Sequence, residues 1–242
     1  MSLGIIAAGG NGTRMNSTVP KPLTLFPEGD TFLDRMIKKI EGIVDNIVVV
    51  TNLAVINDPK FRRNPNCLYR IQPHATGMGD AVFCAADLIN DHDEILILWC
   101  DQIGITRETL LKTIDAHRNV NSNTHGTIPL LSKETKYIHI DFVEHHIKEV
   151  YQAKEGDDVP VPSTSDIGLF MFSSGPNLIA AWTEGGREHS QGKFTKEFNF
   201  LPFLTYLDSI GWSFQKVEAT LSDGMGVNTQ EELIKALNVT RE

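Results

Sequence analysis

The sequence predicts an α/β protein: a single-domain, Rossmann-like three-layer sandwich with a mostly parallel central sheet. Short apolar segments of strand length, the first two rich in β-branched residues, alternate along the chain with helical patterns. Such alternation favours parallel strands whose two faces are both covered by helices. The chain has 242 residues, of which 41% are hydrophobic. This is enough for one full core, so residues 1–242 are expected to form one domain.

The first half of the chain supplies most of the expected strands. They are predicted over residues 3–8, 46–51, 68–71 and 94–99. A helix is expected to begin after Thr31, a favourable N-cap, because apolar residues between Phe32 and Ile40 recur at helical spacing. A second helix is predicted over residues 77–89. These alternating elements would build the core of the sheet.

The second half alternates differently. Apolar residues over 138–150 alternate about Glu144-His145-His146, which indicates a hairpin. Adjacent strand residues point to opposite faces, so the histidine pair is interpreted as part of a turn rather than as a metal site. The remaining expected elements are an exposed loop over 156–165, a strand over 167–172, a helix near 177–182, a polar loop over 185–196 and a helix over 198–210.

Composition excludes several classes of partner. The net charge is −9, from 22 basic and 31 acidic residues, and no basic run is present, so neither a nucleic acid nor an anionic membrane is expected to bind. The three cysteines, Cys67, Cys84 and Cys100, lack metal-ligand spacing and fit reduced, mostly buried thiols. No signal peptide and no stretch approaching ~20 apolar residues is present. A cytoplasmic protein is expected, and homo-oligomer formation stays open.

A glycine-rich turn after the first strand carries the strongest functional signal. It comprises Ala8, Gly9, Gly10, Asn11, Gly12, Thr13 and Arg14, and Lys21 follows between two prolines. Glycines let successive backbone N–H groups point at phosphate oxygens, and the two cations would add charge-assisted hydrogen bonds. The glycine spacing fits neither a dinucleotide fingerprint nor a P-loop. The alternative is an ordinary turn flanked by surface cations, which is disfavoured because turn, arginine and lysine occur together.

Asp101 and Asn228 are candidate metal ligands with structural alternatives. Asp101 follows the predicted 94–99 strand, where open α/β sheets bind ligands and where a carboxylate can hold Mg²⁺. It fits a helix or turn cap equally well. Asn228, in Gly226-Val227-Asn228-Thr229, is likewise a good N-cap.

These motifs together resemble those of the sugar-phosphate nucleotidyltransferase family, whose members include N-acetylglucosamine-1-phosphate uridylyltransferases and glucose-1-phosphate thymidylyltransferases. The resemblance covers essentially the whole chain and implies the nucleotide-diphospho-sugar transferase type of fold. It implies that Asp101 and Asn228 hold one Mg²⁺, although Cys100 replaces the family's glycine before the aspartate. It also implies that Gln72 and Gly77 recognise the base. Met78 and Asp80 depart from the uridylyltransferase pattern, which leaves the choice of base open.

The same resemblance implies an acceptor site. Lys154 matches the lysine that binds the sugar phosphate in the family, but Gln152 and Ala153 stand where a glutamate is common. Asp166 and Glu197 fall where family members contact the sugar. Their alternative reading, as solvated acidic residues at the ends of elements, is about equally supported.

The function expected is Mg²⁺-dependent transfer of a nucleoside monophosphate from an NTP, UTP or CTP in particular, to a sugar 1-phosphate or similar phosphomonoester. Arg14 and Lys21 would be the catalytic cations, and pyrophosphate would leave. Such a transferase would serve nucleotide-sugar biosynthesis. Two alternatives remain: a non-catalytic nucleotide sensor on the same fold, and a nucleotide-sugar-dependent glycosyltransferase. The second would usually present an Asp-x-Asp motif, which Asp101-Gln102-Ile103 does not provide.

Overall fold

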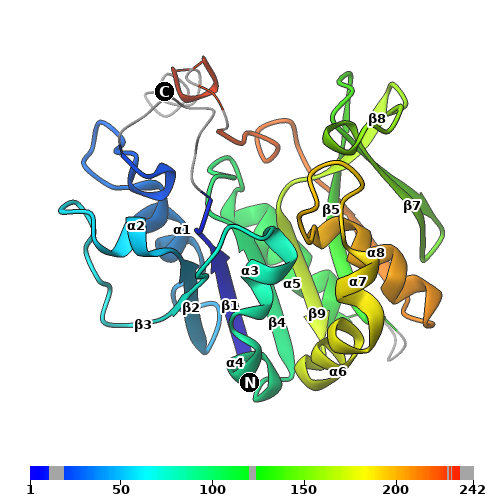
Figure 1. The fold of residues 1–242 in the computed structure, drawn as a ribbon, viewed down its shortest axis with the longest axis horizontal. Coiled ribbons are helices and arrows are strands. Elements are labelled where there is room, and N and C mark those ends of the chain that lie inside the picture. The colour runs from blue at the N-terminus through cyan, green and yellow to red at the C-terminus, as the bar shows by residue number, and fades with distance from the viewer. Residues whose placement is uncertain (11–18, 120–123, 228, 230, 235–242) are drawn as a thin grey trace.

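The computed structural model describes residues 1–10, 19–119, 124–227, 229 and 231–234. Two sheets and their flanking helices make up the described chain (Figure 1). The strands are β1 (Ser2–Ala7), β2 (Asn46–Thr51), β3 (Cys67–Ile71), β4 (Glu94–Trp99), β5 (Gly126–Lys133), β6 (Ile138–Val143), β7 (His146–Gln152), β8 (Ser163–Asp166), β9 (Leu169–Ser173) and β10 (Phe214–Glu218). The α-helices are α1 (Phe32–Ile40), α2 (Leu53–Ile56), α3 (Met78–Phe83), α4 (Ala86–Asn90), α5 (Arg107–Asn119), α6 (Gly175–Ala181), α7 (Arg187–His189) and α8 (Phe200–Ser209).

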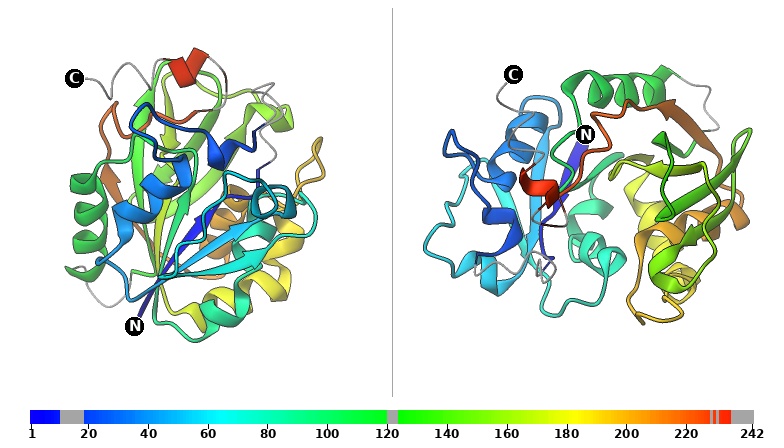
Figure 2. Two further views of the ribbon diagram at one scale, coloured as in Figure 1. Left: turned by 90° about the vertical axis from the view of Figure 1, so that its left-hand side faces the viewer. Right: turned by 90° about the horizontal axis from the view of Figure 1, so that it is seen from above.

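The main sheet has the strand order β10-β5-β9-β4-β1-β2-β3, with β8 paired to β5. The pairs β1–β2, β1–β4, β2–β3 and β5–β10 are parallel. Within this sheet, β8 and β9 run opposite to the other described strands. Since β4 and β5 both oppose β9, they point the same way. The carboxyl ends of six strands therefore meet at one edge of the sheet, which is seen from above in the right-hand view of Figure 2.

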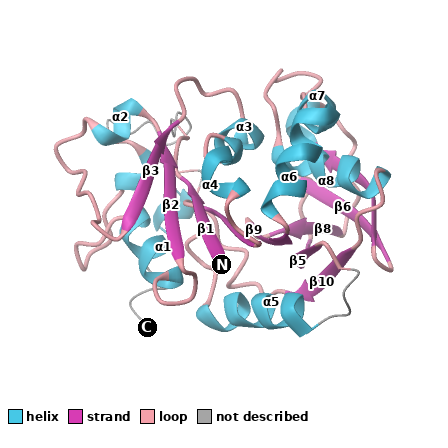
Figure 3. Cartoon of the chain, turned by 90° about the horizontal axis from the view of Figure 1, so that it is seen from below, coloured by secondary structure: helices cyan, strands magenta, loops and turns pink. Residues whose placement is uncertain are grey.

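Helices cover both faces of this sheet, which confirms the predicted three-layer arrangement (Figure 3). Alternate residues of β1 enter different cores: Leu3, Ile5 and Ala7 pack with α3, α4, α6 and α8, whereas Ile6 packs with α1 and α5. This period of two is what a strand buried on both faces requires. The single mixed α/β fold expected from the sequence is thus confirmed.

Local signals placed several elements correctly. The strands predicted over 46–51 and 94–99 have those bounds, and the first strand and the β3 strand differ by one residue. Thr31 caps α1 in a capping box, in which its side chain accepts from the Asp34 backbone N–H and the Asp34 carboxylate accepts from the Thr31 N–H. The predicted hairpin is β6–β7, with Glu144 at φ 56° in its turn. It lies beside α8 and also contacts β8 of the main sheet through β6 (Figure 3).

Three predicted elements differ in the structure. The helix expected over 77–89 is split into α3 and α4, because the backbone leaves helical geometry at Ala85, with φ −102° and ψ 23°. The loop expected over 156–165 ends in strand β8, whose Ser163 and Ser165 are buried against β5. The loop expected over 185–196 begins with helical turns that continue α6 through Trp182–Gly186 into α7.

No helix among the described residues is long and apolar enough to cross a membrane. Two of the three cysteines, Cys67 and Cys100, are buried, and none of the three forms a disulfide. Burial raises the pKa of the Cys67 thiol to about 11 and also raises those of Cys84 and Cys100. The thiols are therefore protonated at neutral pH, as expected for structural cysteines.

Candidate active site

A cavity of 1020 Å³ opens at the carboxyl edge of the main sheet. This volume is at the upper end of the range for small-molecule sites, so there is room for a nucleotide and a second small molecule. Of the residues predicted for the site, the cavity is lined by Ala8, Gly9, Gly10, Lys21, Gln72, Gly77, Asp101, Lys154, Asp166 and Glu197. The others, Asn11, Gly12, Thr13, Arg14 and Asn228, lie outside the described residues.

The exit of β1 into the cavity is fixed by the end of β2. The Thr51 hydroxyl donates to Ala8 O at 3.0 Å and the Asn52 side-chain amide donates to Gly9 O at 2.8 Å. A Cβ at Gly9 would lie 2.8 Å from Gln72 Oε1. Glycine at this position therefore allows the Gln72 amide to approach the turn backbone closely.

Lys21 and Asp101 form an ion pair inside the cavity. Lys21 begins a short 3₁₀ turn (Lys21–Leu23) that is anchored by the buried Leu23, and Asp101 follows β4 directly. Lys21 Nζ lies 2.5 Å from Asp101 Oδ2, and the side chains are 12% and 24% exposed. Partial burial strengthens this attraction relative to a surface pair. The cation predicted for phosphate and the carboxylate predicted for metal are therefore adjacent.

Gln72 and Gly77 are held together by structural contacts of their own. The Gln72 side chain is 5% exposed and its Nε2 donates to Gly77 O at 3.0 Å. Gly77 has φ 122°, and a Cβ there would lie 2.6 Å from Phe198 N. Packing against Phe198 is therefore sufficient to require glycine at this position. Because one amide hydrogen serves Gly77, the second donor and the oxygen of Gln72 remain to read a ligand.

The two departures from the family pattern beside Gly77 have different environments. Met78 lines the cavity, whereas Asp80 is not among the lining residues. The Asp80 carboxylate accepts two hydrogen bonds from the Arg187 guanidinium, at 2.8 and 3.0 Å. Arg187 in turn lies over the Phe198 ring, 3.6 Å from its centroid. Asp80 therefore joins α3 to α7 structurally.

On the far side of the cavity, Lys154 is held by a short chain of hydrogen bonds. Its ammonium group donates to Asn199 Oδ1 and, at 3.3 Å, to Glu197 Oε2. Asn199 Nδ2 donates to Oε1 of the buried Glu155 at 3.1 Å. Burial would raise the pKa of Glu155, but hydrogen bonds from Thr195 and other donors outweigh it and lower that pKa. Glu155 is thus a charged anchor that orients Lys154 through the Asn199 amide.

Asp166 is buried rather than solvated, which excludes the surface alternative for this residue. Asp166 is the last residue of β8, its side chain is buried, and its Oδ2 accepts a hydrogen bond from Gly168 N at 2.9 Å. Burial raises its pKa above the ordinary aspartate value. The Glu197 side chain pairs with Lys154 and is 43% exposed, so Glu197 partly fits the alternative of a solvated acidic residue at the end of an element. The substrate roles of both stay predictions.

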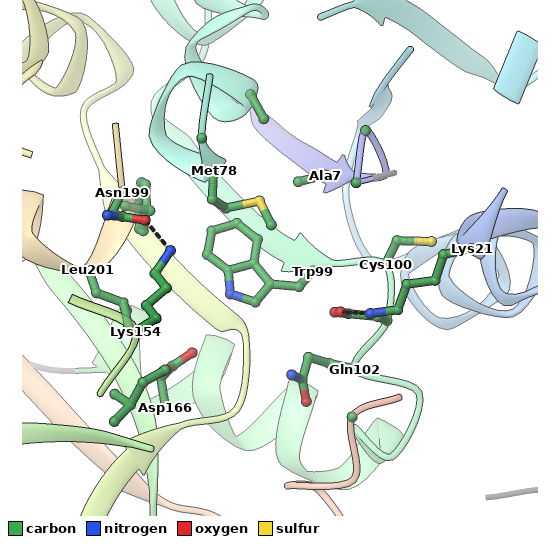
Figure 4. Close-up of a pocket in the computed structure, with 18 of the residues that line it drawn as sticks. Ala7, Lys21, Met78, Trp99, Cys100, Gln102, Lys154, Asp166, Asn199 and Leu201 are labelled. Carbon is green, nitrogen blue, oxygen red and sulfur yellow. Dashed lines mark hydrogen bonds and ion pairs between the residues drawn. The ribbon is translucent and has the colours of Figure 1, made fainter. Parts of the chain in front are cut away.

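The structure brings two further residues into the cavity. Trp99, the last residue of β4, lies between Lys21 and Lys154 in the close-up of Figure 4. Lys133, the last residue of β5, lines the cavity, and its ammonium group donates a long hydrogen bond of 3.4 Å to Gly224 O. The sequence could have indicated Lys133 through its place just after the apolar residues Ile128 to Leu131, at the end of a strand. The β5 strand was not among the elements expected from the sequence. Lys133 adds a further lysine to the cavity lining beside Lys21 and Lys154.

The donor set suits a metal that substrate phosphates help to hold. No group of three or more His, Cys, Asp or Glu side chains with metal-binding geometry occurs among the described residues. Mg²⁺ is commonly bound through one or two protein oxygens together with substrate phosphates and water. Asp101 provides such an oxygen in the cavity, and Val227 N donates to Asp101 O at 3.0 Å, so the chain just before Asn228 passes beside Asp101. Asp101 therefore fits this kind of site, whereas Asn228 lies outside the described residues and its metal role stays a prediction.

A doubly covered α/β sheet binds ligands at its carboxyl edge, and lysines on two sides of one cavity there define an α/β protein suited to phosphorylated ligands. Residues 4–167 match the model of the MobA-like NTP transferase domain. The match covers more than half of the chain, and the chain belongs to this family. It is a nucleotidyltransferase, and the resemblance inferred from its motifs is confirmed.

The sequence similarity to known proteins extends over almost the whole chain. The bifunctional protein GlmU of Clostridioides difficile is 29% identical over 248 residues, covering 98% of this chain and 51% of the relative. The GlmU of Alkaliphilus oremlandii is 29% identical over 235 residues, covering 95% of this chain and 50% of the relative. The chain thus spans about half the length of these curated relatives.

A solved structure shares the fold at low sequence identity. A protein of Bacillus anthracis assigned as a glucose-1-phosphate thymidylyltransferase, crystallised with sucrose, superposes with a TM-score of 0.72 and 15% identity. The match covers 100% of this chain and 96% of that one. It confirms the nucleotide-diphospho-sugar transferase type of fold.

Proposed function

We propose that this protein, acting as one nucleotidyltransferase domain, transfers a nucleoside monophosphate from an NTP to a sugar 1-phosphate or similar phosphomonoester. The main support is that a single cavity holds the Lys21–Asp101 pair on one side and Lys154 on the other. Two phosphate-binding regions in one cavity fit a reaction between two phosphorylated substrates. The similarity to GlmU proteins supports a nucleotide-sugar product.

In this reaction an oxygen of the acceptor phosphate attacks the α-phosphorus of the NTP. A new P–O bond forms, the bond from the α-phosphorus to the bridging oxygen breaks, and pyrophosphate leaves. A phosphomonoester is largely dianionic near neutral pH, since its second pKa is about 6, so no general base is needed. Lys154 would orient the attacking phosphate, with Asp166 and Glu197 near the sugar. Alignment and charge stabilisation would then supply most of the catalysis.

The nucleotide side would rest on the glycine turn and the base-facing residues. The backbone of residues 8–13 and Arg14 would bind the triphosphate, and Lys21 would stabilise charge on the α-phosphate. Gln72 would read the base with its free donor and acceptor, for which UTP or CTP is proposed. Asp101 and Asn228 would hold Mg²⁺, which when bound neutralises charge on the phosphate oxygens.

Pyrophosphate release tests the reaction. UTP, CTP, dTTP, GTP and ATP are each combined with a panel of sugar 1-phosphates and other phosphomonoesters in the presence of Mg²⁺. Release that needs one NTP and one acceptor, and that EDTA abolishes, is the expected result. Nucleotide binding without release from any pair would favour the sensor alternative. Transfer of sugar from a nucleotide-sugar donor would favour the glycosyltransferase alternative.

Lys21→Ala tests the assignment of the catalytic cation. Loss of a group that stabilises transition-state charge is expected to lower turnover by at least ~10²-fold. Lys38→Ala is the matched control, because Lys38 pairs with Asp30 at 2.9 Å on the surface and is 60% exposed. Both variants should keep the wild-type melting temperature within a few degrees. Near-normal turnover of Lys21→Ala would contradict the assignment.

A further inference from the structure

Asp223 is a fully buried carboxylate next to the proposed metal site. Its side chain is 0% exposed, although it lies in the loop between β10 and Asn228. Burying a charged side chain costs free energy unless hydrogen bonds satisfy it, so a buried carboxylate at Asp223 requires such partners. Neither the nucleotide side nor the acceptor side of the cavity uses this residue directly, since it is not among the lining residues.

Asp223 is satisfied by hydrogen bonds from two segments that are distant in sequence. Its Oδ1 accepts from Thr106 N at 2.9 Å and from the Thr106 hydroxyl at 2.8 Å. Its Oδ2 accepts from the Thr109 hydroxyl at 2.8 Å, and from the Thr220 N–H and hydroxyl at 2.8 and 2.6 Å. Burial would raise the pKa of Asp223, but the hydrogen bonds from Thr220 and Thr106 outweigh it, and the pKa is lowered. The carboxylate is therefore charged and spans both segments.

These two segments also contact each other through their backbones. Gly104 N donates to Met225 O at 3.0 Å, and Val227 N donates to Asp101 O at 3.0 Å. A Cβ at Gly104 would lie 2.7 Å from Met225 Cβ and closer still to Ser222 O, so only glycine permits this approach. The segment after Asp101 and the segment before Asn228 are thus packed together over residues 101–106 and 220–227.

A lysine from α1 supports the same arrangement. Lys39 Nζ donates to Ile103 O and to Ile105 O, both at 2.5 Å. These bonds tie the 103–105 backbone to α1, which packs in the same core as Ala219 and Val227 of the Asp223 loop. The segment that follows Asp101 is therefore held both by α1 and by Asp223.

We propose that Asp223 is a positioning residue of the metal site: it joins the segment leading to Asn228 to the segment following Asp101 before any substrate binds. The inference rests on the proposed function in so far as Asp101 and Asn228 are taken as the metal ligands. Residues that orient metal ligands set affinity by removing the cost of assembling the site, and their loss typically weakens metal binding by 10–100-fold. Asp223 would do so through the backbone, without touching the metal or the substrates.

Asp223→Asn tests this role, because it keeps the shape of the side chain but places an amide NH₂ group against hydrogen-bond donors. Mn²⁺ affinity, measured by electron paramagnetic resonance in the presence of a non-hydrolysable UTP or CTP analogue whose phosphates help to hold the metal, is expected to fall at least ~10-fold. The Mg²⁺ concentration that gives half-maximal pyrophosphate release should rise by a similar factor. Turnover at saturating Mg²⁺ should stay within about threefold of wild type, whereas a merely structural defect would lower turnover and leave the Mg²⁺ midpoint unchanged.

The matched control is Asp208→Asn. Asp208 Oδ1 likewise joins distant segments, accepting from Ile147 N at 3.0 Å and contacting His146 Nδ1 at 2.9 Å. This variant should leave Mn²⁺ affinity unchanged. Thr109→Val, which removes one donor to Asp223 without changing side-chain size, should weaken Mn²⁺ binding in the same direction by a smaller factor.

Mn²⁺ affinity of folded Asp223→Asn within twofold of wild type would overturn the proposal. If that variant does not fold, Thr109→Val decides, and an unchanged Mn²⁺ affinity in it would also overturn the proposal. The proposed function fails independently: wild-type protein that binds Mn²⁺ but releases no pyrophosphate would refute the reaction. In that case, a drop in Mn²⁺ affinity on Asp223→Asn would still support the positioning role.

Discussion

Gly77→Ala is predicted to destabilise the fold severely, independently of any effect on substrates. Gly77 has φ 122° and ψ 169°, a region that is essentially restricted to glycine and costs about 1–3 kcal/mol for other residues. The added Cβ would also lie 2.6 Å from Phe198 N, in a backbone contact that a side-chain rotation cannot relieve. Overpacking of this kind costs about 1–3 kcal/mol more. The total expected loss is roughly 2–6 kcal/mol.

Thermal and urea unfolding measure this loss directly. For a domain of this size each kcal/mol lowers the melting temperature by about 2–4 °C, so Gly77→Ala should melt at least about 4 °C below wild type. Gly10→Ala is the matched control, since a Cβ there has no atom of the described residues within 4 Å. That control should keep wild-type stability within about 0.5 kcal/mol, yet weaken nucleotide binding because its methyl group would enter the cavity.

The opposite pattern would refute this reasoning. A Gly77→Ala protein as stable as wild type but defective in nucleotide binding would show that close approach of a base, rather than packing on Phe198, requires glycine there. Equal destabilisation by Gly77→Ala and Gly10→Ala would show that the predicted difference in local space has no energetic consequence.

Two further predictions concern the acceptor side and the pH dependence of stability. Lys133→Met should raise the KM for the acceptor about 10-fold or more, because a charged hydrogen bond is lost, and should leave the KM for the NTP unchanged. Lys136→Met, at an exposed lysine three residues further on, should change neither KM. Equal acceptor KM values for the two variants would contradict a role for Lys133. Burial lowers the pKa of His117 below its usual 6.5, and its ring contacts the Thr127 and Ser173 hydroxyls at 2.9 and 2.8 Å. Because His117 binds a proton at higher pH in the unfolded chain than in the folded protein, the free energy of unfolding of wild type should fall as the pH drops below about 6.5. Urea unfolding of His117→Gln should show a shallower fall. Parallel plots of unfolding free energy against pH for the two proteins would exclude His117 as a source of this dependence.

Much of the nucleotide side was predictable from local sequence. The glycine turn follows β1, and Asp101 comes after β4, which is three strands later in the chain and pairs directly with β1 in the sheet. Parallel strands present their carboxyl ends at one edge, where Lys21 and Asp101 form an ion pair at 2.5 Å. Arg14 and Asn228 fall outside the described residues, and their roles stay predictions.

The acceptor side was less accessible to sequence reasoning. Lys154 carried a family signal, but its hydrogen-bonded support by Asn199 and Glu155 joins residues about forty positions apart. Lys133 was missed because the β5 strand was not recognised in the sequence. The β5 strand contains a proline, and it pairs with β8, β9 and β10 rather than with a strand next to it in sequence. Local periodicity indicates that a strand exists, but does not indicate which strands will be its neighbours.

The sequence by itself determined the fold class, the strand-end positions of the candidate site residues and the class of reaction. It did so because apolar periodicity and glycine-rich turns are properties of contiguous residues. Only the tertiary structure decided that Lys133 enters the cavity, that Asp166 is buried and that Asp223 joins the segments next to Asp101 and Asn228. Those outcomes depend on strand order and on close backbone approach between distant segments, which are fixed by packing of the whole chain rather than by any short stretch of it.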